Sequence, residues 1–321
     1  MKKSAFIVLL ILLSIVYLSI LKFQGFDITV FSRVNLLYVL LGFSSAVGVI
    51  LVRSLKYFLL LRATGINPGK DVVMITNYGF FSNFISPVRI SEIVRSYILK
   101  ARTKAPFFKA LSPTVFDSLI DIAVLVFLIA VLSFFTTVSF DYTSKVIVLL
   151  LFLFLVVGIL ALITSKRGEK IMFTIITKAF RRFIKKDIKQ GSKVFIDTSK
   201  SLMTRRKLLF FAFMLGLSAW LLEGLKFYFF TVAAGLSIGY LTALLLIAIA
   251  YLLGGAFINP SGITQETILL VILLQLPFDK TSLMASGSID AVISIGFVLT
   301  LGLLYTLKLG TGSFKINEAK N

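Results

Sequence analysis

The sequence predicts an all-α polytopic membrane protein with about six full spans and two re-entrant helical hairpins in an inverted-topology repeat. Of its 321 residues 58% are hydrophobic, and the mean hydropathy is +0.99. Several apolar runs reach about 20 residues, the length that crosses a hydrocarbon core. Residues 1–321 are expected to form a single transmembrane domain, because the spans leave no length for a separate soluble domain.

Composition excludes several classes of function. The formal net charge of +20 lies mainly between the apolar runs, where the positive-inside rule explains it, so nucleic acid is not an expected partner. These cations are expected to contact anionic lipid headgroups at the inner surface. His and Cys are both absent, which removes disulfides, thiol nucleophiles and the usual zinc ligands. No metal or cofactor is expected.

The full spans follow the apolar runs, with repeat 1 at about 34–135 and repeat 2 at about 208–307. They are predicted at 5–21, 34–61, 111–135, 146–163, 208–233 and 291–307. A cleaved signal peptide is the alternative for 5–21, but no small-residue cleavage pattern follows. Flanking lysines place both termini in the cytoplasm, which predicts a multi-pass protein of the cell membrane.

Arg53 and Lys56 lie three positions apart, on one face of the second span. They have two interpretations: their long side chains extend to the inner interface, or they contact a phosphate. In a later span, Glu223 and Lys226 have the same spacing and are predicted to form an ion pair.

The first hairpin is predicted from Val72–Ile85, which is too short to span. Its 14 residues rise about 21 Å as a helix, against a hydrocarbon core of about 30 Å. Pro87 then ends the apolar run, and Arg89 and Glu92 follow at membrane depth. Charge survives there only around a protected cavity, so this stretch is expected to form half of a binding site.

The segment 89–109 is predicted to be an amphipathic cytoplasmic helix, with Glu92, Arg95 and Arg102 on its polar face.

Asp117 and Asp121 lie four positions apart on one face of the third span. Two carboxylates within a span are costly unless cations pair with them. They are interpreted either as an ion-pair network that fixes helix packing or as a proton or substrate site. The available cations are Arg53, Lys56, Arg89 and Arg95.

Residues 165–207 form the largest hydrophilic segment and are expected to be cytoplasmic. They carry 14 Lys and Arg against 3 acids, a net charge of 14 − 3 = +11. Apolar residues at helical spacing predict a helix lying on an anionic leaflet, and a protein docking face is the alternative. Those residues are Phe173, Ile176, Phe180 and Phe183.

A second interrupted stretch repeats the first when position n is aligned with position n + 173. Between 78–92 and 251–265, 5 of 15 positions are identical. The matched pairs include Tyr78 with Tyr251 and Pro87 with Pro260. Because the two hairpins enter from opposite sides, they predict an inverted-topology repeat whose broken helices meet at the membrane midplane.

These motifs resemble the lysylphosphatidylglycerol synthase transmembrane (flippase-like) family. Its members carry P-x-R-x-G-E-x-x-R, then E-R-x-x-D, then P-G-G-x-G-x-x-E. The matching residues are Pro87, Arg89, Glu92, Arg95, Asp117 and Asp121, then Pro260, Gly262 and Glu266. Ser91 replaces the family glycine, Asp117-Ser118 replaces Glu-Arg, and the third element is one position short. The resemblance covers about 34–307 and implies a stand-alone member without the soluble aminoacyl-transferase domain.

By this resemblance the chain would move a phosphate-containing lipid, either an anionic phospholipid or a polyprenyl-phosphate-linked lipid, between leaflets. The arginines would bind phosphate, and the acids would balance them. No residue is expected to be catalytic. A membrane-embedded transferase and a non-transporting scaffold in envelope lipid or glycan assembly remain alternatives, and a homo-oligomer remains open.

Overall fold

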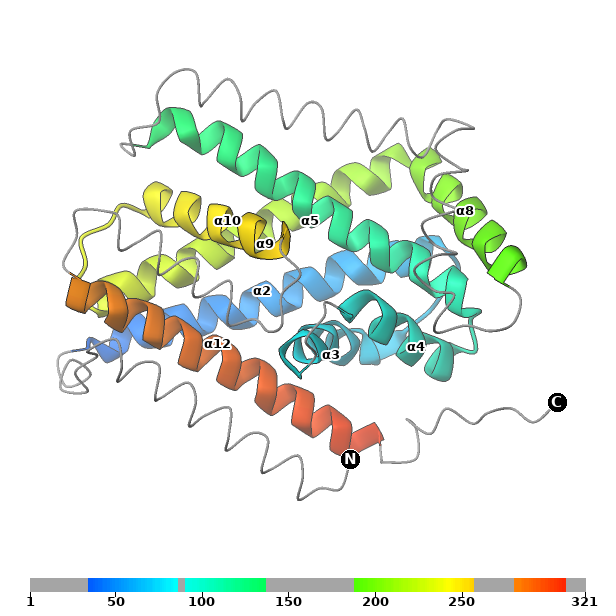
Figure 1. Cartoon of the computed structure of the whole chain (residues 1–321), viewed down its shortest axis with the longest axis horizontal. Coiled ribbons are helices and arrows are strands. Elements are labelled where there is room, and N and C mark those ends of the chain that lie inside the picture. Colours follow the sequence, from blue (N-terminus) through cyan, green and yellow to red (C-terminus); the bar gives the residue numbers. More distant parts are fainter. Residues whose placement is uncertain (1–33, 86–89, 137–187, 257–279, 310–321) are drawn as a thin grey trace.

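The computed structural model describes residues 34–85, 90–136, 188–256 and 280–309, and these residues form helices without a strand (Figure 1). Four helices are long and apolar enough to cross a membrane. They are α2 (Leu36–Ala63), α5 (Phe107–Phe135), α9 (Arg206–Ala233) and α12 (Lys280–Leu309). They confirm four of the predicted spans. The predicted spans at 5–21 and 146–163 lie outside the described residues.

Shorter helices complete the described part. They are the 3-10 turn η2 (Gly69–Asp71), α3 (Val72–Ile85), α4 (Ser91–Thr103), α8 (Ile188–Thr204) and α10 (Tyr240–Ala256). The 14 residues of α3 have the predicted bounds of the short apolar helix. Asn83 links α3 to α4, because its Oδ1 accepts the backbone N–H groups of Ile90 and Ser91 at 3.1 and 3.0 Å. It caps the start of α4, where Ile90 offers no side-chain cap.

α2 and α9 pack antiparallel along their length. The N–H of Asn35 donates to the carbonyl of Ala233 at 3.1 Å, so the start of α2 lies beside the end of α9. Further along the pair, Gly42 faces Phe230 and Gly48 faces Leu222. Glycine lets the two helices approach closely, the usual way in which membrane helices associate.

The helix bounds repeat under the same n + 173 alignment. Shifting α5 gives 280–308 (107 + 173 and 135 + 173), and α12 covers Lys280–Leu309. Shifting α2 gives 209–236 (36 + 173 and 63 + 173), and α9 covers Arg206–Ala233. In Figure 1, α2 and α12 run from left to right along the chain, whereas α5 and α9 run from right to left.

α8 is attached to the bundle by its apolar face. Phe195 is buried against Phe107, Phe108 and Leu111 at the start of α5. The Oγ atoms of Ser112 and Ser199 lie 2.9 Å apart in the same contact. Protein therefore covers the apolar face of α8, the described part of the basic segment. Phe173, Ile176, Phe180 and Phe183 lie outside the described residues.

The outer faces of the long helices carry large apolar side chains. Exposed examples are Leu36, Leu37, Leu40, Leu51, Leu55, Phe134, Phe135, Phe210, Phe211 and Leu304. So much exposed apolar surface is unusual for a protein surrounded by water and suits helices surrounded by lipid.

Gly224 is expected to be essential for the packing of α9 on α10. A Cβ at this position would lie 3.1 Å from the Cα of Leu244, a backbone atom that cannot move aside alone. Gly224→Ala should therefore lower the unfolding free energy by about 1–3 kcal/mol, measured as thermal unfolding in detergent. Gly296→Ala in α12 is the control, because a Cβ there meets nothing within 4 Å. Equal stability of both variants would contradict close α9–α10 packing.

Candidate functional site

The two cations of α2 are buried inside the bundle. Arg53 is 8% exposed and Lys56 is 0% exposed. The interpretation that both side chains extend to the inner interface is therefore wrong. The face of α2 that carries them packs on neighbouring helices, and acids from those helices neutralise them. Each cation belongs to a different cluster of charged side chains.

The first charge cluster consists of Lys56, Arg95, Asp117 and Asp121, from α2, α4 and α5. The Nζ of Lys56 lies 2.6 Å from Asp121 Oδ1 and 3.1 Å from Asp117 Oδ1, and it donates to the Asp117 carbonyl at 3.2 Å. The contacts to Asp121 Oδ1 and to the Asp117 carbonyl are hydrogen bonds, and the contact to Asp117 Oδ1 is an ion pair. Arg95 Nη1 donates to Asp117 Oδ2 at 2.8 Å. The first cluster therefore joins three helices through one carboxylate.

Arg95 is predicted on the polar face of its helix, but the structure leaves it only 5% exposed. Its guanidinium carbon lies 4.8 Å from the centre of the Tyr57 ring, a cation–π contact. Its alkyl chain fills the space that a side chain at Gly79 would need, since a Cβ there would lie 2.7 Å from Arg95 Cδ. Burial lowers the pKa of Arg95, but Asp117 and its other neighbours outweigh burial and raise it, so the charge is permanent.

Glu92 lies beside the first cluster rather than in it. Ser118 Oγ donates to Glu92 Oε1 at 2.7 Å, which ties the start of α4 to α5. Ser118 is where the resembled family has arginine.

The second charge cluster consists of Arg53, Glu223, Lys226 and Asp290, from α2, α9 and α12. Lys226 Nζ lies 2.6 Å from Glu223 Oε1 and 2.8 Å from Asp290 Oδ1, and it donates to Ser294 Oγ at 2.9 Å. The predicted pair of Glu223 with Lys226 is confirmed. Tyr251 on α10 adds a hydrogen bond to Glu223 Oε1 at 3.1 Å.

Asp290 is missed by the sequence prediction, which begins the last span at 291. The structure places this residue inside α12, which begins earlier, at Lys280. Asp290 is 0% exposed, and Lys226 neutralises it. A carboxylate can lie within a span when a cation of another helix pairs with it.

The n + 173 alignment is the signal that could have identified Asp290. Asp117 aligns with Asp290 (117 + 173), Asp121 with Ser294 and Arg53 with Lys226. In each half, a lysine of the first long helix contacts two positions four apart on the last long helix. Lys56 contacts Asp117 and Asp121, and Lys226 contacts Asp290 and Ser294.

The charges balance in both clusters, with two cations and two acids among the described residues of each. Balance matters because an unpaired charge buried at membrane depth is expensive. Asp117 and Asp121 therefore form ion pairs, as their interpretation as members of an ion-pair network expects. Within the described residues, no three His, Cys, Asp or Glu side chains group closely enough to hold a metal.

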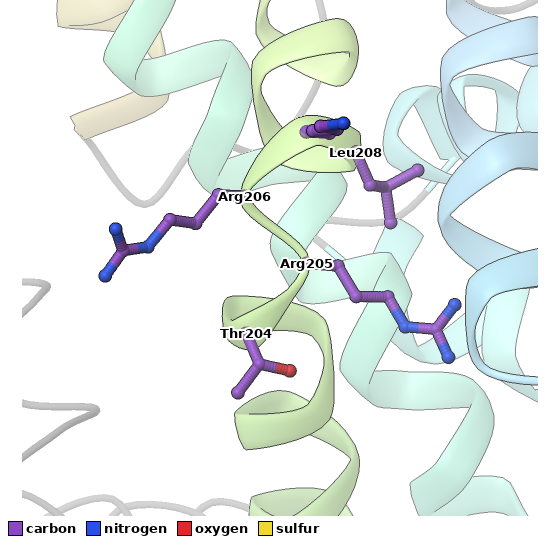
Figure 2. Close-up of a pocket in the computed structure, with 5 residues that line it drawn as sticks. Thr204, Arg205, Arg206 and Leu208 are labelled. Atoms are coloured by element: carbon purple, nitrogen blue, oxygen red, sulfur yellow. The ribbon is translucent and has the colours of Figure 1, made fainter.

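The remaining predicted site residues lie outside the described residues. They are Pro87, Arg89, Pro260, Gly262 and Glu266. An open pocket occurs elsewhere, at the junction of α8 and α9, lined by residues 204–208. In Figure 2 the side chains of Arg205 and Arg206 extend away from each other, so they do not converge on one point. The second charge cluster is distant from this pocket, because Glu223 lies about 25 Å further along α9 by the helical rise.

Lys56 is expected to be a main determinant of stability. Lys56→Met removes the cation that holds Asp121. Because the Asp121 side chain is 22% exposed, the loss should lie below the value of about 3–5 kcal/mol that a fully buried unpaired charge costs. Adding Asp121→Asn should recover part of that loss, because the acid without a partner is then neutral. Thermal unfolding of the two single variants and the double variant measures the coupling.

The control for this cycle is Arg102→Gln. Arg102 lies 3.8 Å from Asp71, with side chains 37% and 28% exposed, so its loss should cost less than about 1 kcal/mol. If the effects of Lys56→Met and Asp121→Asn simply add, the two residues do not interact.

The sequence was also compared with known proteins. The profile of the family described as "Lysylphosphatidylglycerol synthase TM region" matches residues 5–302. Comparison with curated proteins gave no match, and neither did comparison with solved structures. The family match covers most of the chain and includes all eight members of the two charge clusters. The chain therefore belongs to the lysylphosphatidylglycerol synthase transmembrane-region family.

Proposed function

We propose that this protein moves a phosphate-containing lipid between the two leaflets of the membrane. Family membership and the apolar helices indicate a membrane protein with a lipid-related function. The observation that carries the finer proposal is the pair of charge clusters, in which helices of the bundle bury four cations and three acids and leave a fourth acid, Asp121, half-buried. A lipid headgroup needs such a polar interior to cross a layer of about 30 Å of hydrocarbon.

An inverted-topology repeat is the second part of the proposal. It is supported by the helix bounds that recur under the n + 173 alignment and by the antiparallel α2–α9 pair. It is also supported by the alignment of Asp117 with Asp290 and of Asp121 with Ser294, because a lysine contacts both positions in each half. Transporters of this plan open their central site to the two sides of the membrane in turn, by moving one repeat against the other. We propose that α3 and α10 belong to two re-entrant hairpins and that Pro87 and Pro260 break the chain at their tips.

The charge clusters lie where α2 contacts α5 and α9, so a movement of α2 along these helices would change the contacts of their charges. A shift of one helix along another, which changes the partners of interface charges, is one of the ways in which proteins switch between two arrangements. Arg53 and Lys56 sit one turn apart on α2, and their acids come from helices of different halves. A shift of α2 along its neighbours would exchange these partners. Cations contact both oxygens of the Asp117 carboxylate, so this acid has no free oxygen to act as the base of a transferase.

The orientation follows from the basic segment and is also a proposal. With 165–207 in the cytoplasm, α9 runs outward and the α9–α10 turn lies outside. We expect a cysteine at exposed Ser237, between α9 and α10, to react with an impermeant maleimide on intact cells. A cysteine at exposed Lys193 on α8 should react only after permeabilisation. The reverse pattern would contradict the orientation.

Transport can be tested directly in proteoliposomes. Tail-labelled fluorescent phosphatidylglycerol in the inner leaflet is protected from dithionite unless the protein moves it outward. Asp290→Asn keeps the size of the side chain but removes one of the two acids that contact Lys226 among the described residues, so the rate should fall at least tenfold. Asp71→Asn is the matched control, since the Asp71 side chain is 28% exposed. If the wild-type protein leaves the inner leaflet protected, the proposed function is wrong.

A further inference from the structure

Arg53 differs from the other buried cations in its contacts. Lys56, Arg95 and Lys226 each have a carboxylate oxygen within 2.6 to 2.8 Å. The nearest acid to Arg53 is Glu223, whose Oε2 lies 4.0 Å from Nη2, beyond hydrogen-bonding distance. Within the described part of the chain, the Nε and Nη2 groups of Arg53 are buried and have no acceptor.

Aromatic rings enclose this guanidinium. Its central carbon lies 4.8 Å from the Trp220 ring centre and 5.2 Å from that of Phe80. Trp220 is 3% exposed, and its indole N–H is also a buried donor without an acceptor among the described residues. Two neighbouring side chains thus offer buried donors that no described acceptor uses. Such a set calls for an acceptor that the described residues do not supply, because buried donors are nearly always paired.

The acid nearest to Arg53 accepts its hydrogen bonds through Oε1, whereas its Oε2 lies 4.0 Å from Arg53. Glu223 accepts from Lys226 at 2.6 Å and from Tyr251 at 3.1 Å. An anion arriving at Arg53 would therefore break no hydrogen bond within the described network. Displacing Arg95 from Asp117, or Lys56 from Asp121, would break a bond of 2.8 or 2.6 Å. Among these buried cations, Arg53 can bind a ligand at the lowest cost.

We propose that Arg53 anchors the phosphate group of a lipid headgroup, in a site between α2, α3 and α9 that Phe80 and Trp220 enclose. The planar guanidinium suits phosphate because it presents two parallel donors. The site lies in the interior of α2, about 15 Å of helix from the nearer end of that span. This inference deepens the proposed function and rests on it for the assignment of the phosphate to a lipid.

Trp220 provides the measurement, since it is the only tryptophan of the chain. Its fluorescence in the purified protein is titrated with dihexanoyl-phosphatidylglycerol, with dihexanoylglycerol, which lacks phosphate, and with inorganic phosphate. We expect saturable binding of the phosphatidylglycerol only. Arg53→Gln should weaken its affinity at least tenfold, and Arg53→Lys should weaken it less, because the charge remains while the planar fork is lost.

Arg62→Gln is the matched control. Arg62 lies on the same helix, also beside an aromatic ring, with its guanidinium carbon 5.7 Å from the Phe58 ring centre, but it is exposed. Its replacement should leave the affinity unchanged. Unfolding temperatures establish that each variant is folded, and Arg53→Lys keeps the test decisive if Arg53→Gln does not fold.

The outcomes separate the possibilities. Equal affinity of wild type and folded Arg53 variants, or equal binding of dihexanoylglycerol, overturns the site. Inorganic phosphate that binds as tightly as the lipid supports the anion site and overturns its assignment to a lipid. Arg53-dependent lipid binding without transport in proteoliposomes supports the site and overturns only the proposed function.

Discussion

Lys56 is the charge on which the arrangement of the first half depends. An ammonium group buried inside an apolar helix is costly unless acids pair with it, so α5 must present Asp117 and Asp121 where α2 presents Lys56. Asp117 then uses its other oxygen to hold Arg95 of α4. The short helix that follows α3 is thus positioned by charge pairing as much as by apolar packing.

The second half also buries a lysine and pairs it with polar side chains of its last long helix. Lys226 of α9 contacts Asp290 and Ser294 of α12, at the positions that align with Asp117 and Asp121. A serine replaces the second acid because Glu223 on α9 supplies the second negative charge. Each cluster is neutral, which lets both halves bury charge at a lower cost than unpaired groups would have. The close α2–α9 contact brings the two clusters next to each other through Arg53 and Lys56.

Arg53 is the exception to this close pairing. Its burial between two aromatic rings keeps water away, while the nearest carboxylate stays 4.0 Å from it. A protein selected only for stability has no reason to keep a guanidinium in such a place, since an apolar side chain would fit it at lower cost. A ligand that supplies the missing acceptor gives a physical reason for the arrangement.

The sequence by itself determined the membrane class, the spans at 34–61, 111–135 and 208–233, the short helix Val72–Ile85, the family, and the pair of Glu223 with Lys226. These depend on run length and on spacing along one helix, which a sequence contains directly. Only the tertiary structure decided that Arg53, Lys56 and Arg95 are buried and that Asp290 belongs inside a span. The reason is that a charge in an apolar helix is tolerated only when another helix neutralises it, and that partner is a property of packing.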